Sequence, residues 1–256
     1  TDMRGGNLIL NGGILADTVQ NVASFTLASG GMNSITVNSP GAFTTTLNLG
    51  AITRGISAGT VRFFPSSLGS INTTTANNAV TGMLGTTGTA FATINDGTGT
   101  YFAINDGTGK IVPLTYGGPQ NNVATWVAAN NVTDDASGFT GTVTNGAVNS
   151  IRFNGAGPST VNIAPTGTLV IGSGGILQTS RVTDGASRII GGGRLVSGTS
   201  ELVVTADSLT QLFEINARLA GGTAITKTGN GTLLLSGFGD YSGATQIQGG
   251  TLQVSG

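Results

Sequence analysis

The sequence contains no cysteine and no histidine among its 256 residues. These absences exclude a disulfide framework, an ordinary zinc site, a cysteine nucleophile and a Ser-His-Asp triad. Charged residues make up only 8% of the chain, the formal net charge is -1, and the ten basic residues are scattered singly, so the sequence offers no basic patch for nucleic acid. No apolar run approaches the ~20 residues that span a bilayer.

The first residues, TDMRGGNLIL, do not resemble a signal peptide. We therefore expect a mature fragment, or a piece of a longer protein.

Aromatic residues are also scarce, at 5% of the chain, so Leu, Ile, Val and small residues must fill the core. The 44 glycines separate short runs such as NLIL, TLVI, ELVV and TLLL. These runs are too apolar and too β-prone for a disordered linker. The composition therefore predicts an ordered, β-rich protein.

One short phrase recurs along the chain: a small residue, three or four strand residues and then a turn. Very short strands at close, uneven intervals favour a solenoid over a sandwich, whose strands are longer and are joined by hairpins. The stretch ADSLTQLFEINARL from Ala206 also alternates like a strand, and within GTLLL the alternation places Leu233 and Leu235 on one face. Similarly, Leu252 and Val254 share a face and Gln253 points outward.

These patterns predict an all-β fold, a parallel β-helix (β-solenoid) that forms a single elongated domain. With ~22 residues per coil, the chain would make on the order of eleven coils. The expected inward anchors of the C-terminal half are Ile151, Val161, Leu169, Ile189, Leu195, Leu202, Leu212, Leu219, Leu233, Ile247 and Leu252.

The stretch from Thr226, TKTGNGTLLLSGFGDYSGATQIQGGTLQVSG, resembles the autotransporter-associated β-strand repeat, also called the passenger-associated repeat. The pattern is close to K-x-G-x-G-T-L-x-L-S-G, then Y-x-G-x-T-x-I, then G-G-T-L-x-V. The matching residues are Lys227, Gly229, Gly231, Thr232, Leu233, Leu235, Ser236, Gly237, Tyr241, Gly243, Thr245, Ile247, Gly250, Thr251, Leu252 and Val254.

This resemblance implies a right-handed parallel β-helix in a secreted or surface-displayed bacterial protein. It also implies a division into irregular coils with long loops over 1–140, regular coils over 141–225 and the repeat over 226–256. In such proteins the implied role of the repeat is to fold outside the cell and project a stalk.

The motif INDGTG occurs twice between Phe91 and Lys110. Asp-Gly is a strong turn signal, so we interpret both copies as turns, with Ile94 and Ile104 as inward anchors. The alternative is a calcium site, if Asp96 and Asp106 converge on one ion. No cofactor is expected.

Asp134 and Asp135, with Arg152 as a partner, are the strongest catalytic candidates. Adjacent carboxylates on an extended strand face opposite sides, which makes a poor pair for glycoside chemistry. We therefore interpret them as part of a solvated loop and expect no enzyme. Arg62 should point outward, and Trp126 should be buried rather than form a sugar-stacking platform.

The sequence thus predicts a structural or adhesive segment of an extracellular bacterial surface protein or fibre, acting as a stiff stalk. The expected partners are further coils of a longer chain, or copies of itself stacked end to end, and surface glycans; nucleic acid and a direct membrane span are not expected. The alternatives are a carbohydrate-active β-helix enzyme and a calcium-dependent binding module.

Overall fold

The computed structural model describes residues 1–28 and 30–255. These residues form β-strands and one short 3-10 helix, η1 (Val123–Thr125). Within the described chain, no helix is long and apolar enough to cross a membrane. The contacts divide the chain into two compact units, residues 1–114 and residues 115–256.

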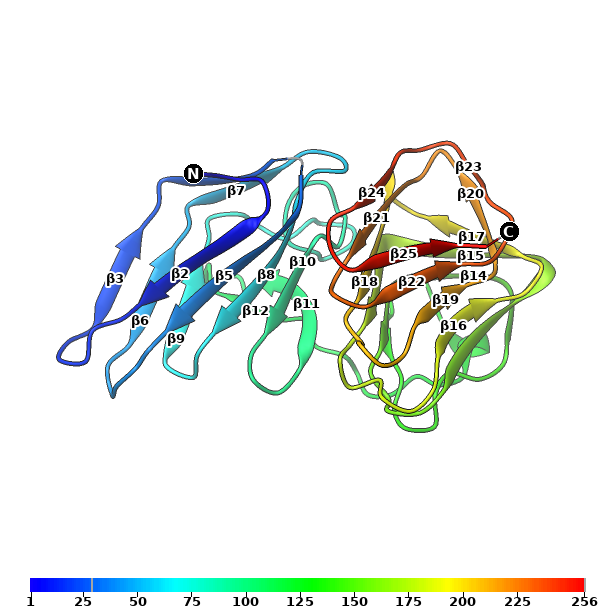
Figure 1. The fold of residues 1–256 in the computed structure, drawn as a ribbon, viewed down its shortest axis with the longest axis horizontal. Coiled ribbons are helices and arrows are strands. Elements are labelled where there is room, and N and C mark those ends of the chain that lie inside the picture. Colours follow the sequence, from blue (N-terminus) through cyan, green and yellow to red (C-terminus); the bar gives the residue numbers. More distant parts are fainter. Residues whose placement is uncertain (29, 256) are drawn as a thin grey trace. The chain divides into compact units, whose positions relative to one another are not determined.

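The first unit is a stack of parallel coils with three sides (Figure 1). Successive coils contribute one strand to each side, in the orders β1-β4-β7, β2-β5-β8 and β3-β6-β9. The strands are β1 (Asp2–Met3), β2 (Gly6–Asn11), β3 (Thr18–Asn21), β4 (Ser24–Leu27), β5 (Met32–Asn38), β6 (Thr45–Asn48), β7 (Ala51–Arg54), β8 (Thr60–Pro65) and β9 (Gly69–Asn72).

Strand alternation separates an apolar interior from polar ladders on the outer faces. In β5, Ile35 and Val37 are fully buried, whereas Asn38 points outward and donates to Asn11, 27 residues earlier, at 2.9 Å. The outward Asn48 donates in the same way to Asn21 at 2.8 Å. The coils are therefore joined by strand pairing, by apolar columns inside and by side-chain ladders outside.

An antiparallel meander ends this parallel stack. Strand β10 (Ala92–Asn95) pairs in parallel with β8, but β11 (Thr100–Asn105) and β12 (Ile111–Pro113) follow in antiparallel order. The turn after β11 lies against β9, where the Thr73 N–H donates to the Gly109 carbonyl at 2.8 Å. The meander thus covers strand edges that another coil would otherwise pair with.

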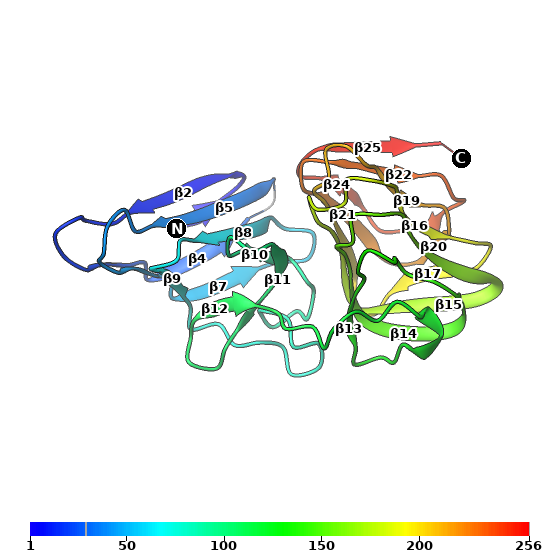
Figure 2. The ribbon, with the colours of Figure 1, turned by 90° about the horizontal axis from the view of Figure 1, so that it is seen from below.

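The second unit is a separate parallel stack, in which β14 and β15 run around the corners. Successive stretches of β15 pair with β16, β17 and β18, and Figure 2 shows β16, β19, β22 and β25 stacked in this order. The strands are β13 (Asn131–Thr133), β14 (Thr142–Phe153), β15 (Ser159–Gln178), β16 (Ser187–Ile190), β17 (Arg194–Ser197), β18 (Glu201–Ala206), β19 (Phe213–Ile215), β20 (Arg218–Gly221), β21 (Ala224–Thr228), β22 (Thr232–Leu235), β23 (Asp240–Tyr241), β24 (Thr245–Ile247) and β25 (Thr251–Val254).

A chain of aromatic rings runs through the core of the second unit. Trp126 packs edge-to-face on Phe139, Phe139 on Phe153, and Phe153 contacts Phe213, each pair with ring centroids 5.1 Å apart. Such edge contacts add about 0.5–1.5 kcal/mol beyond the area that the rings bury. Trp126 is 8% exposed, and its indole N–H donates to the Gln120 carbonyl. It is buried as predicted.

The structure confirms the all-β, parallel solenoid fold. It has about nine turns rather than eleven, because the antiparallel meander and the long connections add residues without adding coils. A single domain was expected, whereas the contacts define two units that divide after Leu114. The stretch from Ala206 contains β19, in which Phe213 and Ile215 face inward. The inward anchor expected here was Leu212, which is instead half-buried and lies just before the strand, so that expectation was wrong.

Candidate functional site

The repeat-like segment builds the last coils of the second unit, from β21 to β25. Leu233 is fully buried and Leu235 is 5% exposed, while the intervening Leu234 is half-buried. In the next coil, Leu252 pairs with Leu233 and Val254 pairs with Leu235. The two strands therefore continue the same inward columns, as the alternation in the sequence predicted.

The glycines of the repeat lie where one coil crosses closely over the preceding one. A Cβ on Gly231 would lie 2.1 Å from the Ser208 carbonyl oxygen, and one on Gly237 would lie 2.1 Å from that of Asn216. No side chain fits at such distances without a shift of the backbone. The other repeat glycines with a preceding-coil carbonyl oxygen within 2.4 Å of an added Cβ are Gly229, Gly243 and Gly250.

Lys227 occupies an unexpected place in an otherwise apolar column. Strand pairing aligns it with Val204 in one coil and with Ile247 in the next, and it is fully buried. Its ammonium group donates to the carbonyl oxygens of Thr228 and Gly229 at 2.8 and 2.9 Å, and to that of Gly249 at 3.0 Å. The side chain therefore binds the corner of its own coil and the corner of the next one.

The remaining repeat positions, apart from Thr232 on β22 and the serine that follows this strand, lie on the outermost described coil. Tyr241 and Leu252 pack against the core only partly, and the Tyr241 hydroxyl lies 3.0 Å from the Thr245 hydroxyl. Ile247 was expected to be an inward anchor, yet it is 56% exposed. It pairs with Lys227 on one side, and among the described residues no strand pairs with it on the other. The polar Thr232 and Thr251 pair with each other across the two coils.

The two INDGTG motifs form the two turns of the meander. Asp96 accepts from the backbone and the hydroxyl of Thr98, and Asp106 accepts from the same two groups of Thr108. Burial opposes the shift at Asp96, but the Thr98 hydrogen bonds lower the pKa of its carboxyl; those from Thr108 lower the pKa of Asp106. Because the turns lie at opposite ends of β11, the two carboxylates do not converge.

Asp134 does not lie in a solvated loop, so that interpretation was wrong for this residue. It is 3% exposed, and its Oδ1 accepts from the backbone N–H groups of Asn154 and Gly155, the latter at 2.8 Å. Burial raises the pKa of its carboxyl, although hydrogen bonds oppose the shift. Asp134 therefore fixes the turn of the next coil.

Asp135 points to the other side, where it accepts from Asn121 at 2.7 Å. The two aspartates do not form a carboxylate pair. Arg152 pairs with Thr133, the residue before Asp134. Its guanidinium stacks over the Tyr116 ring at 5.4 Å and donates to the Thr133 hydroxyl. Arg62 faces outward as predicted and donates to Thr93 on the neighbouring strand.

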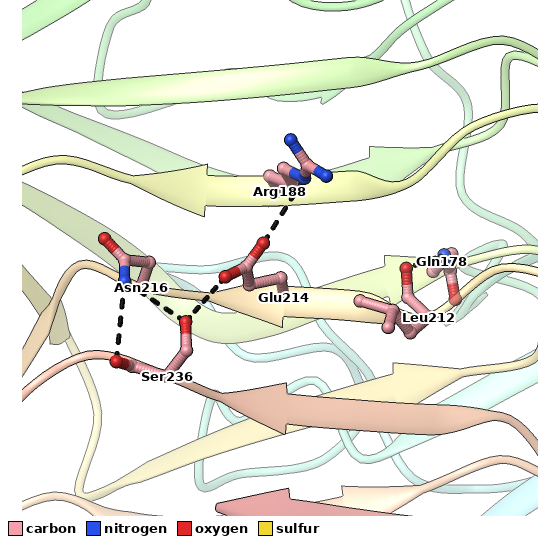
Figure 3. Close-up of polar contacts among 6 residues, drawn as sticks. All are labelled: Gln178, Arg188, Leu212, Glu214, Asn216 and Ser236. Carbon is pink, nitrogen blue, oxygen red and sulfur yellow. Dashed lines mark hydrogen bonds and ion pairs between the residues drawn. The ribbon is translucent and has the colours of Figure 1, made fainter. Parts of the chain in front are cut away.

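Sequence reasoning missed the polar ladder on the outer face of the second unit (Figure 3). Arg188 and Glu214 form an ion pair at 3.3 Å, and Glu214 accepts from Ser236 at 2.6 Å. Asn216 donates to the Ser236 hydroxyl, 20 residues later, at 3.1 Å. The ladder residues are outward-facing polar residues that recur once per coil. Because the coils differ in length, these residues do not recur at a constant interval in the sequence, and the pattern is difficult to recognise.

Comparison with known proteins agrees with the repeat pattern. Residues 225–254 match the family model described as the passenger-associated-transport-repeat. The chain is 29% identical over 235 residues to the adhesin BmaC autotransporter of Brucella suis biovar 1 (strain 1330), an alignment that covers 88% of this chain and 6% of that protein. No solved structure is significantly similar to the chain. The C-terminal coils thus carry a passenger-associated repeat, and the chain corresponds to a small part of a very long relative.

Proposed function

We propose that this chain is a structural and adhesive segment of an extracellular bacterial surface protein, in which its coils are part of a stiff, β-helical stalk. The passenger-associated repeat supports the extracellular location, since it occurs here within a parallel stack. The adhesive role rests on the similarity to a protein named an adhesin. The separation of Asp134 from Asp135 supports a role other than catalysis.

The observation that carries the stalk proposal is the register between successive coils of the second unit, in which inward residues of one coil pair with inward residues of the coil before. Val254 is 74% exposed, although Leu235, its partner one coil earlier, is 5% exposed. Ile247 is likewise exposed, although its strand-pairing partner in the preceding coil, Lys227, is fully buried. In a solenoid each coil is stabilised by its nearest neighbours, so a further coil would cover Val254 as β25 covers Leu235.

The repeat register allows this proposal to be tested directly. Since Leu235 pairs with Val254, Ser236-Gly237 and Ser255-Gly256 hold equivalent places in the sequence. A copy of residues 238–256 fused after residue 256 therefore continues the pattern in frame. We expect the amides of β25 to gain protection from hydrogen exchange and the second unit to melt at a higher temperature.

The matched control is a fusion of the same length in which the inward positions of the added copy, equivalent to Leu252 and Val254, are replaced by Asp. This copy should give β25 no protection. Unchanged exchange in the in-frame fusion would contradict the stalk proposal. We further propose that the chain stacks on copies of itself through the coil formed by β23, β24 and β25, so that Val254→Lys should weaken self-association and Gln253→Lys, on the outward face, should not.

A further inference from the structure

The first unit carries a groove of about 900 Å³ on its outer surface. One wall is formed by the sheet β3-β6-β9, and the other by the turn between β11 and β12. Its polar lining includes Asn21, Asn48, Ser70, Asn72, Thr108 and Lys110. This volume lies within the usual range for sites that hold small ligands or segments of polymers.

The sheet side of the groove presents a row of asparagine amides, one from each coil. Asn48 donates to Asn21 at 2.8 Å, and Asn72 donates to Asn48 at 2.9 Å. A primary amide has two N–H donors and an oxygen with two lone pairs, so the ladder uses only part of its capacity. The row is thus a linear array of donors and acceptors, repeated at the ~4.8 Å spacing of paired strands.

The second INDGTG motif supplies the opposite wall and its charge. Asn72 and Lys110 form a β-bridge that fixes the turn beside the ladder. The Asp106 carboxylate accepts from Thr108 and from the Lys110 backbone, within its own turn. Lys110 is the charged side chain among the described residues that line the groove. Its charge also acts on Asp106, whose pKa is lowered by the Thr108 hydrogen bonds and then by Lys110.

This chemistry distinguishes between classes of ligand. An added peptide strand would need an open sheet edge, whereas the wall is the outer face of strands that already pair with one another. Nucleic acid would need several cations along the groove. A polysaccharide, in contrast, presents repeated hydroxyl groups that match amides and threonine or serine hydroxyls, and an acidic sugar matches the ammonium group.

We propose that this groove binds a linear acidic polysaccharide, with the Asn21–Asn48–Asn72 ladder holding sugar hydroxyls and Lys110 holding a carboxylate. The proposal rests on the adhesive part of the proposed function and gives it a ligand class. Its failure would leave the stalk proposal intact, since the fused-coil experiment concerns a different unit and a different readout.

The test is titration calorimetry of the whole chain with alginate oligosaccharides, which carry carboxylates, and with dextran oligosaccharides of the same length, which do not. We expect alginate to bind. Asn48→Ala and Lys110→Ala should each weaken binding by about tenfold or more. Lys110→Arg should retain most of the affinity, because it preserves the charge.

The matched control is Asn38→Ala, which removes a rung of the same kind from the outward pair Asn38–Asn11, outside the groove. It should leave the affinity for alginate unchanged. Circular dichroism verifies that each variant keeps its β-structure. The proposal is overturned by absence of alginate binding, by equal binding of dextran, or by equal losses in Asn38→Ala and Asn48→Ala.

Discussion

The ammonium group of Lys227 donates to the carbonyl oxygen of Gly249 at 3.0 Å and so joins the corners of two successive coils. It also donates to the carbonyls of Thr228 and Gly229 in its own coil. A cation that replaces an apolar residue in a core column is stable here because backbone oxygens surround its nitrogen.

Replacing this group should therefore destabilise the repeat coils. We expect Lys227→Met, which keeps the apolar stem but removes the donors, to lower the free energy of unfolding of the second unit by about 2–3 kcal/mol. Urea denaturation measures the effect. Arg181→Met, at an exposed position of the same unit, is the control and should change it little. Similar losses in both variants would contradict the role given to Lys227.

The glycines at the coil corners lead to a second prediction, a difference in stability between two glycine-to-alanine variants. Gly237→Ala would place a methyl group 2.1 Å from the Asn216 carbonyl oxygen, whereas nothing lies within 4 Å of a Cβ on Gly222. We expect Gly237→Ala to cost about 1–3 kcal/mol, because the two coils must move apart. Gly222→Ala should be nearly neutral. Thermal melting of both variants compares them, and equal melting temperatures would show that close coil contact does not select this glycine.

The sequence predicted which side chains of strand β22 face the core, because the alternation of apolar and polar residues within a short strand is a local property. Leu233 and Leu235 lie inside, as GTLLL indicates, and the Asp-Gly pairs mark turns. The identity of Lys227 as a core residue was not predictable, because its burial depends on carbonyl groups of Gly249 and other residues that only the stacking of coils brings near. Charge alone suggests exposure.

The burial of Asp134 and the direction of the strands that follow the INDGTG turns also depend on residues distant in the sequence, so local patterns do not predict them. Asp134 is buried by a turn 20 residues later in the chain, at Asn154. The sequence around Asp96 indicates a turn but does not specify whether the next strand continues the coil or folds back. It folds back here, so the meander ends the first stack.

The assignment of inward and outward side chains in β22 and β25 leads to a third prediction. We expect Leu233→Asp to destabilise the second unit by more than about 3 kcal/mol, because it places an unpaired charge at a fully buried position. Gln253→Asp should have a mild effect, since this side chain is exposed on β25. A denaturant titration distinguishes them, and equal effects would mean that the assignment of inward and outward positions is wrong.

The adjacent carboxyls of Asp134 and Asp135 should make opposite contributions to stability as pH changes. Burial raises the pKa of Asp134 in the folded state, so its contribution is full below the unfolded pKa of about 4 and is lost as pH rises through the folded value. Hydrogen bonds from Ser137 and Asn121 lower the pKa of Asp135. Its contribution is therefore present above about pH 4 and is lost as pH falls.

Two conservative variants test these signs. Asn at position 134 keeps an oxygen that can accept from Asn154 and Gly155 but has no carboxyl to ionise. We therefore expect Asp134→Asn to gain stability relative to the original chain as pH rises from about 4 to 7. Asp135→Asn should instead lose stability relative to it as pH rises toward about 4 from more acidic values, and should change little between about 4 and 7. Urea denaturation at a series of pH values measures both differences, in which the titration of every other group cancels. Parallel pH profiles for the two variants would refute the separate environments assigned to these neighbours.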